Sequence, residues 1–169
     1  MFGSKVGFAQ SELPNRNWGD KKGVKVLNLS GPRVGLTLVT GEDKNRLKNK
    51  FDANPLIVQF GYQFEKRFFS TNNGVTALTE FIPLVGGLDQ SLLIPSVSWL
   101  LGIRTASGFE FAFGPNLTMK DKSVKDIKPA FVFATGYSLK MDGMYFPFNF
   151  AVSRSRDGLH YNFTTGFNL

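Results

Sequence analysis

The stretch Leu56–Phe68, LIVQFGYQFEKRF, decides the fold of this chain. Alternate residues form two unlike faces, because successive side chains of an extended strand point to opposite sides. The first face is mostly aromatic or aliphatic and comprises Leu56, Val58, Phe60, Tyr62, Phe64, Lys66 and Phe68. The second face carries glycine, amide and charged residues. The pattern predicts a β-strand and leaves open which face meets solvent.

The same alternation recurs along the chain and predicts eight strands, with no helix. The predicted strands are 33–40, 56–68, 75–85, 92–105, 109–119, 130–141, 144–152 and 159–169. The connection 41–55 is expected to be a long charged loop, and 120–128 another, whereas Asp142-Gly143 is typical of a tight hairpin turn. Long and short connections alternate, which predicts short turns at one end of an up-and-down array and longer loops at the other.

Composition excludes several kinds of site. The chain has 169 residues, 18 Phe, one His and no Cys, and 20% of its residues are charged. The lack of Cys excludes disulfides and thiolate metal sites, and one His leaves little for a histidine metal site, so no cofactor is expected. No run of 18 apolar residues is present, so no transmembrane helix is predicted. The net charge of +7 suggests an anionic partner.

The volume of a small barrel decides which face points inward. The interior of eight strands is barely wide enough for its own side chains, so the aromatic faces would overfill it. With the aromatic faces outward, the small and amide residues fill a narrow lumen, as in transmembrane barrels. A closed barrel also satisfies every backbone hydrogen bond, which lipid requires. The predicted fold is all-β: a closed eight-stranded antiparallel up-and-down transmembrane β-barrel.

With this architecture, residues 33–169 resemble the small eight-stranded outer-membrane barrels of Gram-negative bacteria, the OmpA- and OmpX-type proteins. The most specific likeness is the last strand, in which alternate residues form a C-terminal assembly signal: Tyr161, Phe163, Thr165, Phe167 and Leu169. The family usually ends in an aromatic residue, so Leu169 departs from its pattern. The phrases SGPRVGLTLVTG, FEKRFFS, EFIPLVGGLDQ and FGPNL also look like outer-membrane proteins of Bacteroidetes.

The resemblance implies a location in the bacterial outer membrane. Gly7-Phe8-Ala9 has the small-x-small form of a cleavage site, so residues 1–10 are interpreted as a signal-peptide remnant, with an ordinary N-terminus as the alternative. Residues 11–32 are then expected to form an N-terminal periplasmic segment, and 33–169 the barrel. The implied partners are outer-membrane lipid, lipopolysaccharide, the barrel-assembly machinery and a larger outer-membrane complex. Nucleic acid is not expected, because the aromatic residues belong to the lipid face.

The lumen face collects six charged residues from five consecutive strands: Arg33, Glu65, Arg67, Glu80, Arg104 and Glu110. Three carboxylates balance three guanidiniums, as buried charges require. This set is interpreted as a salt-bridged plug that seals the lumen. A gate or ion path is the alternative.

His160 is the only residue with the chemistry of a catalytic base, and its parity places it inward near the outer rim. Lipid A-modifying eight-stranded barrels use a histidine at the rim together with a serine and an acid, and His160 resembles that histidine in its position. Ser153, Ser155, Asp89 and Ser91 are the available neighbours in sequence, but no motif is complete. A hydrogen-bonded structural role is therefore expected for His160, and the protein is expected not to be an enzyme.

The expected function is that of a small integral outer-membrane protein with a filled polar lumen and a structural or interaction role. A lipid A-modifying enzyme and a soluble lipocalin-like carrier are the alternatives. Four prolines lie inside predicted strands: Pro83, Pro95, Pro115 and Pro147. Bulges are expected to accommodate them and to shift the facing beyond them.

Overall fold

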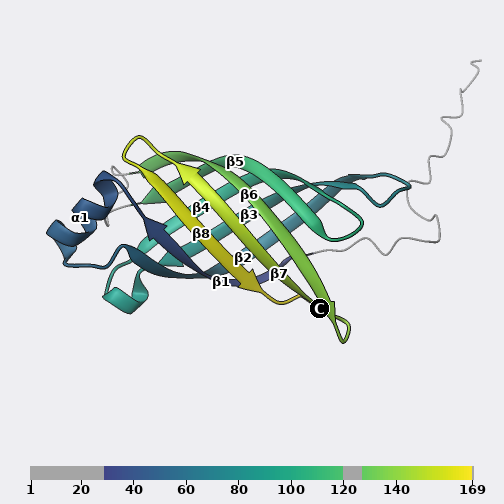
Figure 1. Cartoon of the computed structure of the whole chain (residues 1–169), viewed down its shortest axis with the longest axis horizontal. Helices are drawn as coiled ribbons and strands as arrows, with labels where there is room; N and C mark the ends of the chain where they lie inside the picture. Colours follow the sequence, from purple (N-terminus) through teal and green to yellow (C-terminus); the bar gives the residue numbers. More distant parts are fainter. Residues whose placement is uncertain (1–28, 120–126, 169) are drawn as a thin grey trace, which may run out of the picture.

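Eight antiparallel strands form a closed barrel in which β1 completes the sheet by pairing with β8 (Figure 1). The computed structural model describes residues 29–119 and 127–168. The proposed signal remnant, residues 11–28 of the predicted periplasmic segment and Leu169 lie outside the described residues. The strands are β1 (Gly31–Val39), β2 (Leu56–Ser70), β3 (Thr76–Gly86), β4 (Ile94–Arg104), β5 (Phe109–Met119), β6 (Ile127–Met141), β7 (Met144–Arg154) and β8 (Leu159–Gly166).

Strand number, up-and-down order and facing agree with the alternation in the sequence. In β2, the side chains of Phe60, Tyr62 and Phe64 are exposed on the outside, whereas Gln59 and Gln63 are buried inside. The last strand is shorter than predicted, because β8 ends at Gly166 and is followed by an isolated bridge between Tyr145 and Asn168. The assembly-signal residues Tyr161, Phe163 and Phe167 are exposed on the outside.

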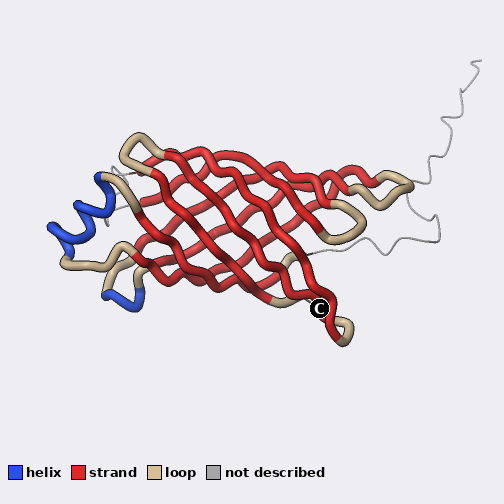
Figure 2. The backbone as a smooth tube through the Cα atoms, viewed as in Figure 1, coloured by secondary structure: helices blue, strands red, loops and turns tan. Residues whose placement is uncertain are grey.

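The short and long connections lie at opposite ends of the barrel, as predicted (Figure 2). The β2–β3, β4–β5 and β6–β7 turns share one end with the start of β1 and the end of β8, here called the short-turn end. Asp142 and Gly143 both have positive φ, 47° and 84°, as the predicted hairpin dipeptide requires. The opposite end, called the α1 end, carries the helical segments.

The expectation that no helix is present is wrong. Residues Glu42–Phe51 form α1 within the predicted loop 41–55, and Leu88–Gln90 form the 3₁₀ turn η1. Acidic residues occupy the first turn of α1 and basic residues the last turn, which is the order that the helix dipole favours. Asp43 is buried while most of α1 is exposed. The helix is therefore stabilised by the charged residues in its first and last turns and by the buried side chain of Asp43, and not by an apolar face.

The prediction of bulges at the prolines is also wrong. The β3–β4 ladder passes through Pro83 and Pro95 in one register, and β5–β6 and β6–β7 pass through Pro115 and Pro147. The β2–β3 ladder skips the pair opposite Pro83, and β4–β5 skips the pair opposite Pro115, without a register shift. In an antiparallel strand one residue bonds to one neighbour only, so a proline interrupts one ladder and spares the other. Among the described strands, the register shifts between Arg67 and Phe69.

The interior is mixed: buried apolar side chains lie around Leu100 and also at Val39, Ile57 and Leu84. Leu78 and Leu100 are buried on the inside, and Leu100 packs with Ala112 and Val132. Hydroxyl, amide and charged side chains occupy most of the remaining inward positions, which is opposite to the apolar interior of a lipocalin-like carrier. Among the described residues, neither α1 nor η1 is long and apolar enough to cross a membrane.

Candidate functional site

Arg104, the last residue of β4, organises a group of buried side chains near the short-turn end of the lumen. Its Nη1 and Nη2 donate to Glu65 Oε1 and Oε2 at 2.9 and 2.5 Å. Its Nε donates to Glu110 Oε2 at 2.7 Å, across the β4–β5 pair. The side chains of Arg104 and Glu65 are 3% and 0% exposed. A bidentate guanidinium–carboxylate pair is among the stronger hydrogen-bonded contacts, and here it is nearly free of water.

Arg33 and Glu80 are joined to this group through Gln63. The Nε of Arg33 donates to Gln63 Oε1 at 2.9 Å, and Gln63 Nε2 donates to Glu80 Oε1. All three residues are buried. Arg33, Gln63, Glu65, Glu80, Arg104 and Glu110 together are called the inner cluster below. Because these side chains are almost inaccessible to solvent, the cluster fills the lumen at this level.

The segments next to both ends of the chain complete the inner cluster. Arg33 Nη2 donates to the Leu29 carbonyl, and the Leu29 amide donates to Glu65 Oε2 at 3.2 Å. From the other end of the chain, Asn168 Oδ1 accepts from Arg33 Nη1 at 3.2 Å. Leu29 and Asn168 are both buried. The short-turn end of the lumen is thus covered by residues that precede β1 and follow β8.

The structure separates Arg67 from the other predicted lumen charges. Arg67 is exposed and lies on β2 beside the register shift. The inner cluster therefore contains three carboxyl groups and two guanidiniums instead of the three of each that the sequence predicted. β2 extends past the level of the inner cluster, and its last residues are exposed. A side chain near the end of the strand can therefore have inward parity without being buried.

The three carboxyl groups of the inner cluster are close enough together to suggest a metal site. Oxygen atoms of Glu65, Glu80 and Glu110 all lie within 4.8 Å of one another. Arg104 donates to two of these groups and Gln63 to the third. The guanidinium of Arg104 and the amide of Gln63 therefore supply the positive charge and the hydrogen-bond donors around these carboxyl groups. The geometry is that of an ion-pair cluster.

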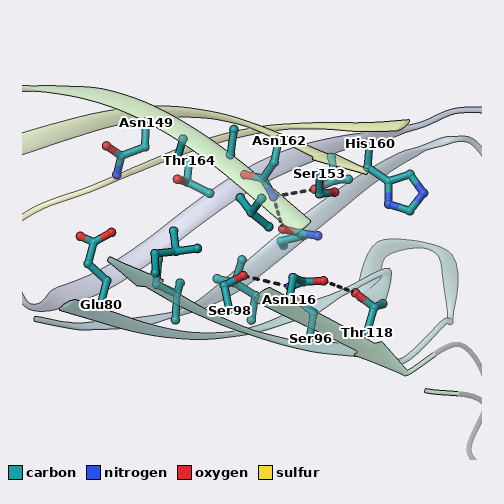
Figure 3. A pocket seen from close by; sticks show the side chains of 18 of the residues that line it. Glu80, Ser96, Ser98, Asn116, Thr118, Asn149, Ser153, His160, Asn162 and Thr164 are labelled. Carbon is teal, nitrogen blue, oxygen red and sulfur yellow. Dashed lines mark hydrogen bonds between the residues drawn. The ribbon is translucent and has the colours of Figure 1, made fainter. Parts of the chain in front are cut away.

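A cavity lined by both polar and apolar side chains lies between the inner cluster and the α1 end, and Ile82, Leu100 and Val132 form part of its wall. Its volume is about 100 Å³. Figure 3 shows Glu80 at one end and His160 at the other, with serine, threonine and asparagine side chains between them. Asn116 Nδ2 donates to Ser98 Oγ at 2.9 Å on one wall, and Asn162 Nδ2 donates to Thr37 and Gln59 at 2.8 Å on another. This cavity is called the chamber below.

His160 lies at the rim of the α1 end, where its Nε2 is 3.1 Å from Asp43 Oδ2. Lys128 Nζ donates to Asp43 Oδ1 at 3.2 Å and also pairs with Asp157. Asp43, Lys128, Asp157 and His160 are called the rim cluster below. They come from α1, β6, the β7–β8 connection and β8, so the cluster ties α1 to the barrel.

The serines and the acid considered with His160 are arranged differently. Ser153 is the cross-strand neighbour of His160 and lines the chamber. Ser155 donates to the Gly158 carbonyl at 3.3 Å within the β7–β8 connection. Asp89 and Ser91 belong to the η1 region, and the acid beside His160 is Asp43 instead.

The sequence did not single out five of the site residues: Gln63, Asn168, Asp43, Lys128 and Asp157. The alternation in the sequence assigns Gln63 and Asn168 to the lumen face, and this could have identified them. They were missed because only charged residues were collected from that face. Asp43 carried no signal, because it lies in the segment predicted as a solvated loop. Its burial depends on α1 folding back over the barrel end.

Comparison of the chain with models of known families, with curated proteins and with solved structures finds no match. The outer-membrane family and a bacterial origin therefore stay predictions, and functional inference depends on the geometry.

Proposed function

We propose that this protein is a small integral outer-membrane β-barrel with a structural or interaction role. The observation that carries the proposal is a belt of large apolar side chains exposed round the outside of the barrel. Phe133, Trp99, Phe111 and Phe68 are each more than 60% exposed, and every strand contributes to the belt. Soluble monomers rarely expose apolar patches larger than roughly 300–600 Å². Hydrocarbon is the environment in which such a belt has no hydration cost.

The closed sheet and the occupied lumen support the same proposal. A closed barrel leaves no unpaired edge, which a lipid environment requires. The inner cluster fills the lumen near the short-turn end, so the proposed role does not include an open pore. A role in contacts within the membrane, including those of a larger complex, uses the outer face instead.

The ends of the barrel fit the orientation that outer-membrane barrels have. The exposed residues of α1 include Lys44, Arg46, Lys48 and Lys50, and cations of this kind bind lipid phosphates. The α1 end is therefore proposed to face the cell exterior and lipopolysaccharide. Lys66 is outward and exposed near the short-turn end, where its stem can extend along the lipid and its ammonium can reach headgroups.

Fractionation of cells that express the protein tests the membrane assignment. The protein is expected in the outer-membrane fraction, to need detergent for extraction, and to migrate differently on gels before and after boiling. The shift on boiling reports the closed barrel independently of location. Extraction into buffer alone, with the heat shift retained, would show a soluble barrel and refute the proposal.

The contact between His160 and Asp43 favours a second candidate, a lipid A-modifying enzyme that uses a rim histidine. An acid 3.1 Å from an imidazole nitrogen is the arrangement that orients a general base. His160→Ala would abolish any deacylase or acyltransferase activity on lipid A, with Arg156→Ala in the neighbouring connection as a control. If neither variant changes the lipid A profile of the host, the enzymatic candidate is excluded.

A further inference from the structure

The chamber contains polar side chains that have no hydrogen-bond partner among the described residues. Within residues 29–119 and 127–168, no protein hydrogen bond reaches the side chains of Ser96, Asn149, Ser153 or Thr164. All four line the chamber, and they come from β4, β7 and β8 (Figure 3). All four side chains are partly exposed to the chamber, so water or a ligand there can satisfy them.

The groups that line the chamber favour a neutral occupant. Its wall donors and acceptors are hydroxyls and amides, and the charged groups at its two ends already have partners. Glu80 accepts from Gln63, Glu110 accepts from Arg104, and His160 contacts Asp43. An ion in the chamber would lose its hydration without gaining a free counter-charge. A neutral molecule with several hydroxyl groups would instead find donors and acceptors on both walls.

The chamber is larger than single buried waters require. At the roughly 30 Å³ that one water occupies in the liquid, a cavity of about 100 Å³ holds about three waters. A second cavity of about 80 Å³ lies directly under α1, where Leu47 and Phe51 line it. The two cavities share five lining residues: Thr37, Gln59, Ser96, Thr118 and His160. The route into the chamber from the α1 end therefore passes beneath α1.

We propose that the chamber is a binding site for a small uncharged polyhydroxy molecule, which enters past α1. The hydroxyl and amide walls select the ligand, the inner cluster closes the far end, and the rim cluster holds α1 over the entrance. This inference depends on the interior of the barrel and not on what surrounds its outer face.

Titration of isotope-labelled refolded protein with xylitol, followed by amide NMR, tests the proposal. Saturable shifts are expected at Ser98, Asn116 and Asn162, and none with the trisaccharide raffinose at equal concentration. Thr164→Val preserves side-chain shape and removes one hydroxyl, so it is expected to raise the dissociation constant about fivefold. Ser153→Leu fills the chamber and should abolish the shifts, whereas Ser107→Leu in the exposed β4–β5 turn should leave them unchanged.

Asp43→Asn tests the entrance separately. Loss of the carboxylate weakens the rim cluster, so xylitol exchange is expected to accelerate about tenfold, with Glu42→Gln in the same helical turn as the control. Absence of saturable chamber shifts in the wild-type protein would mean that the chamber holds water only, and would overturn the proposal. Equal shifts in the wild type and in a folded Ser153→Leu variant would also overturn it, because the binding would then lie elsewhere.

Discussion

Arg104 holds the inner cluster together, because one guanidinium contacts carboxyl groups from β2 and β5. Its planar group donates along two edges, which an ammonium cannot do with the same geometry. Arg33 serves a different purpose at the same level. It contacts an amide, Gln63, and the Leu29 carbonyl, so it connects the cluster to the segment before β1.

Removal of Arg104 should therefore destabilise the barrel strongly. Arg104→Ala leaves Glu65 and Glu110 buried without their main donor, and such a loss costs about 3–5 kcal/mol. Urea unfolding of the refolded protein measures the change. Arg154→Ala is the matched control, since Arg154 at the end of β7 is exposed and surface substitutions usually stay within about 0.5 kcal/mol. Similar midpoints for the two variants would show that the buried pair does not stabilise the fold.

At the scale of the elements, inward glycines accompany two of the strand prolines. A Cβ atom at Gly61 would lie 2.1 Å from the Pro83 carbonyl oxygen. One at Gly114, the residue before Pro115, would lie 2.1 Å from the Trp99 carbonyl oxygen. At both places the ladder skips the pair opposite the proline. The glycines allow the neighbouring backbones to approach where the proline has removed a hydrogen bond, so the register continues without a bulge.

Two alanine substitutions distinguish this backbone contact from ordinary crowding. Gly114→Ala must move the β4 backbone, and overpacking of this kind costs about 1–3 kcal/mol. In Gly136→Ala the nearest atom is Asn149 Oδ1, the end of a side chain that can rotate away. The second variant should therefore unfold near the wild-type urea midpoint, because alanine also lowers the entropy of the unfolded chain. The explanation fails if Gly136→Ala is the more destabilising of the two.

At the scale of the whole molecule, the barrel is inverted relative to a soluble protein. Aromatic contacts form between side chains on the outside, such as Phe113 with Phe131 and Phe150 with Tyr161. Inside, stability comes from ion pairs, amide hydrogen bonds and a small apolar group around Leu100. The proposed membrane location would supply an apolar solvent for this outer face.

Arginine substitution at two equally exposed phenylalanines tests that location. Phe133 lies in the middle of β6 and is 63% exposed, and Phe68 lies near the end of β2 and is 65% exposed. In lipid vesicles, Phe133→Arg should cost about 2–4 kcal/mol and Phe68→Arg about 0–1 kcal/mol, because the cost of a charge depends on depth. Unfolding in urea measures both, with Phe133→Leu as the volume control. Equal costs would argue against a bilayer around the barrel.

The sequence by itself determined the number of strands, their facing and their up-and-down order. These are local properties: a period of two in β2 assigns Phe60 and Gln63 to opposite faces whatever the rest of the chain does. The outward aromatic residues followed from one further constraint, the small interior of an eight-stranded barrel. The Asp142-Gly143 turn was equally local.

Only the tertiary structure decided which inward residues meet. Barrel closure and strand stagger bring Arg104, Glu65 and Glu110 to one level while Arg67 lies beyond it. The burial of Asp43 needed α1 to fold over the barrel end, against residues from β6 and β8. Alternation in sequence sets the direction of a side chain but not its height along the barrel axis. Height comes from the registers between strands, and those form only when the sheet closes.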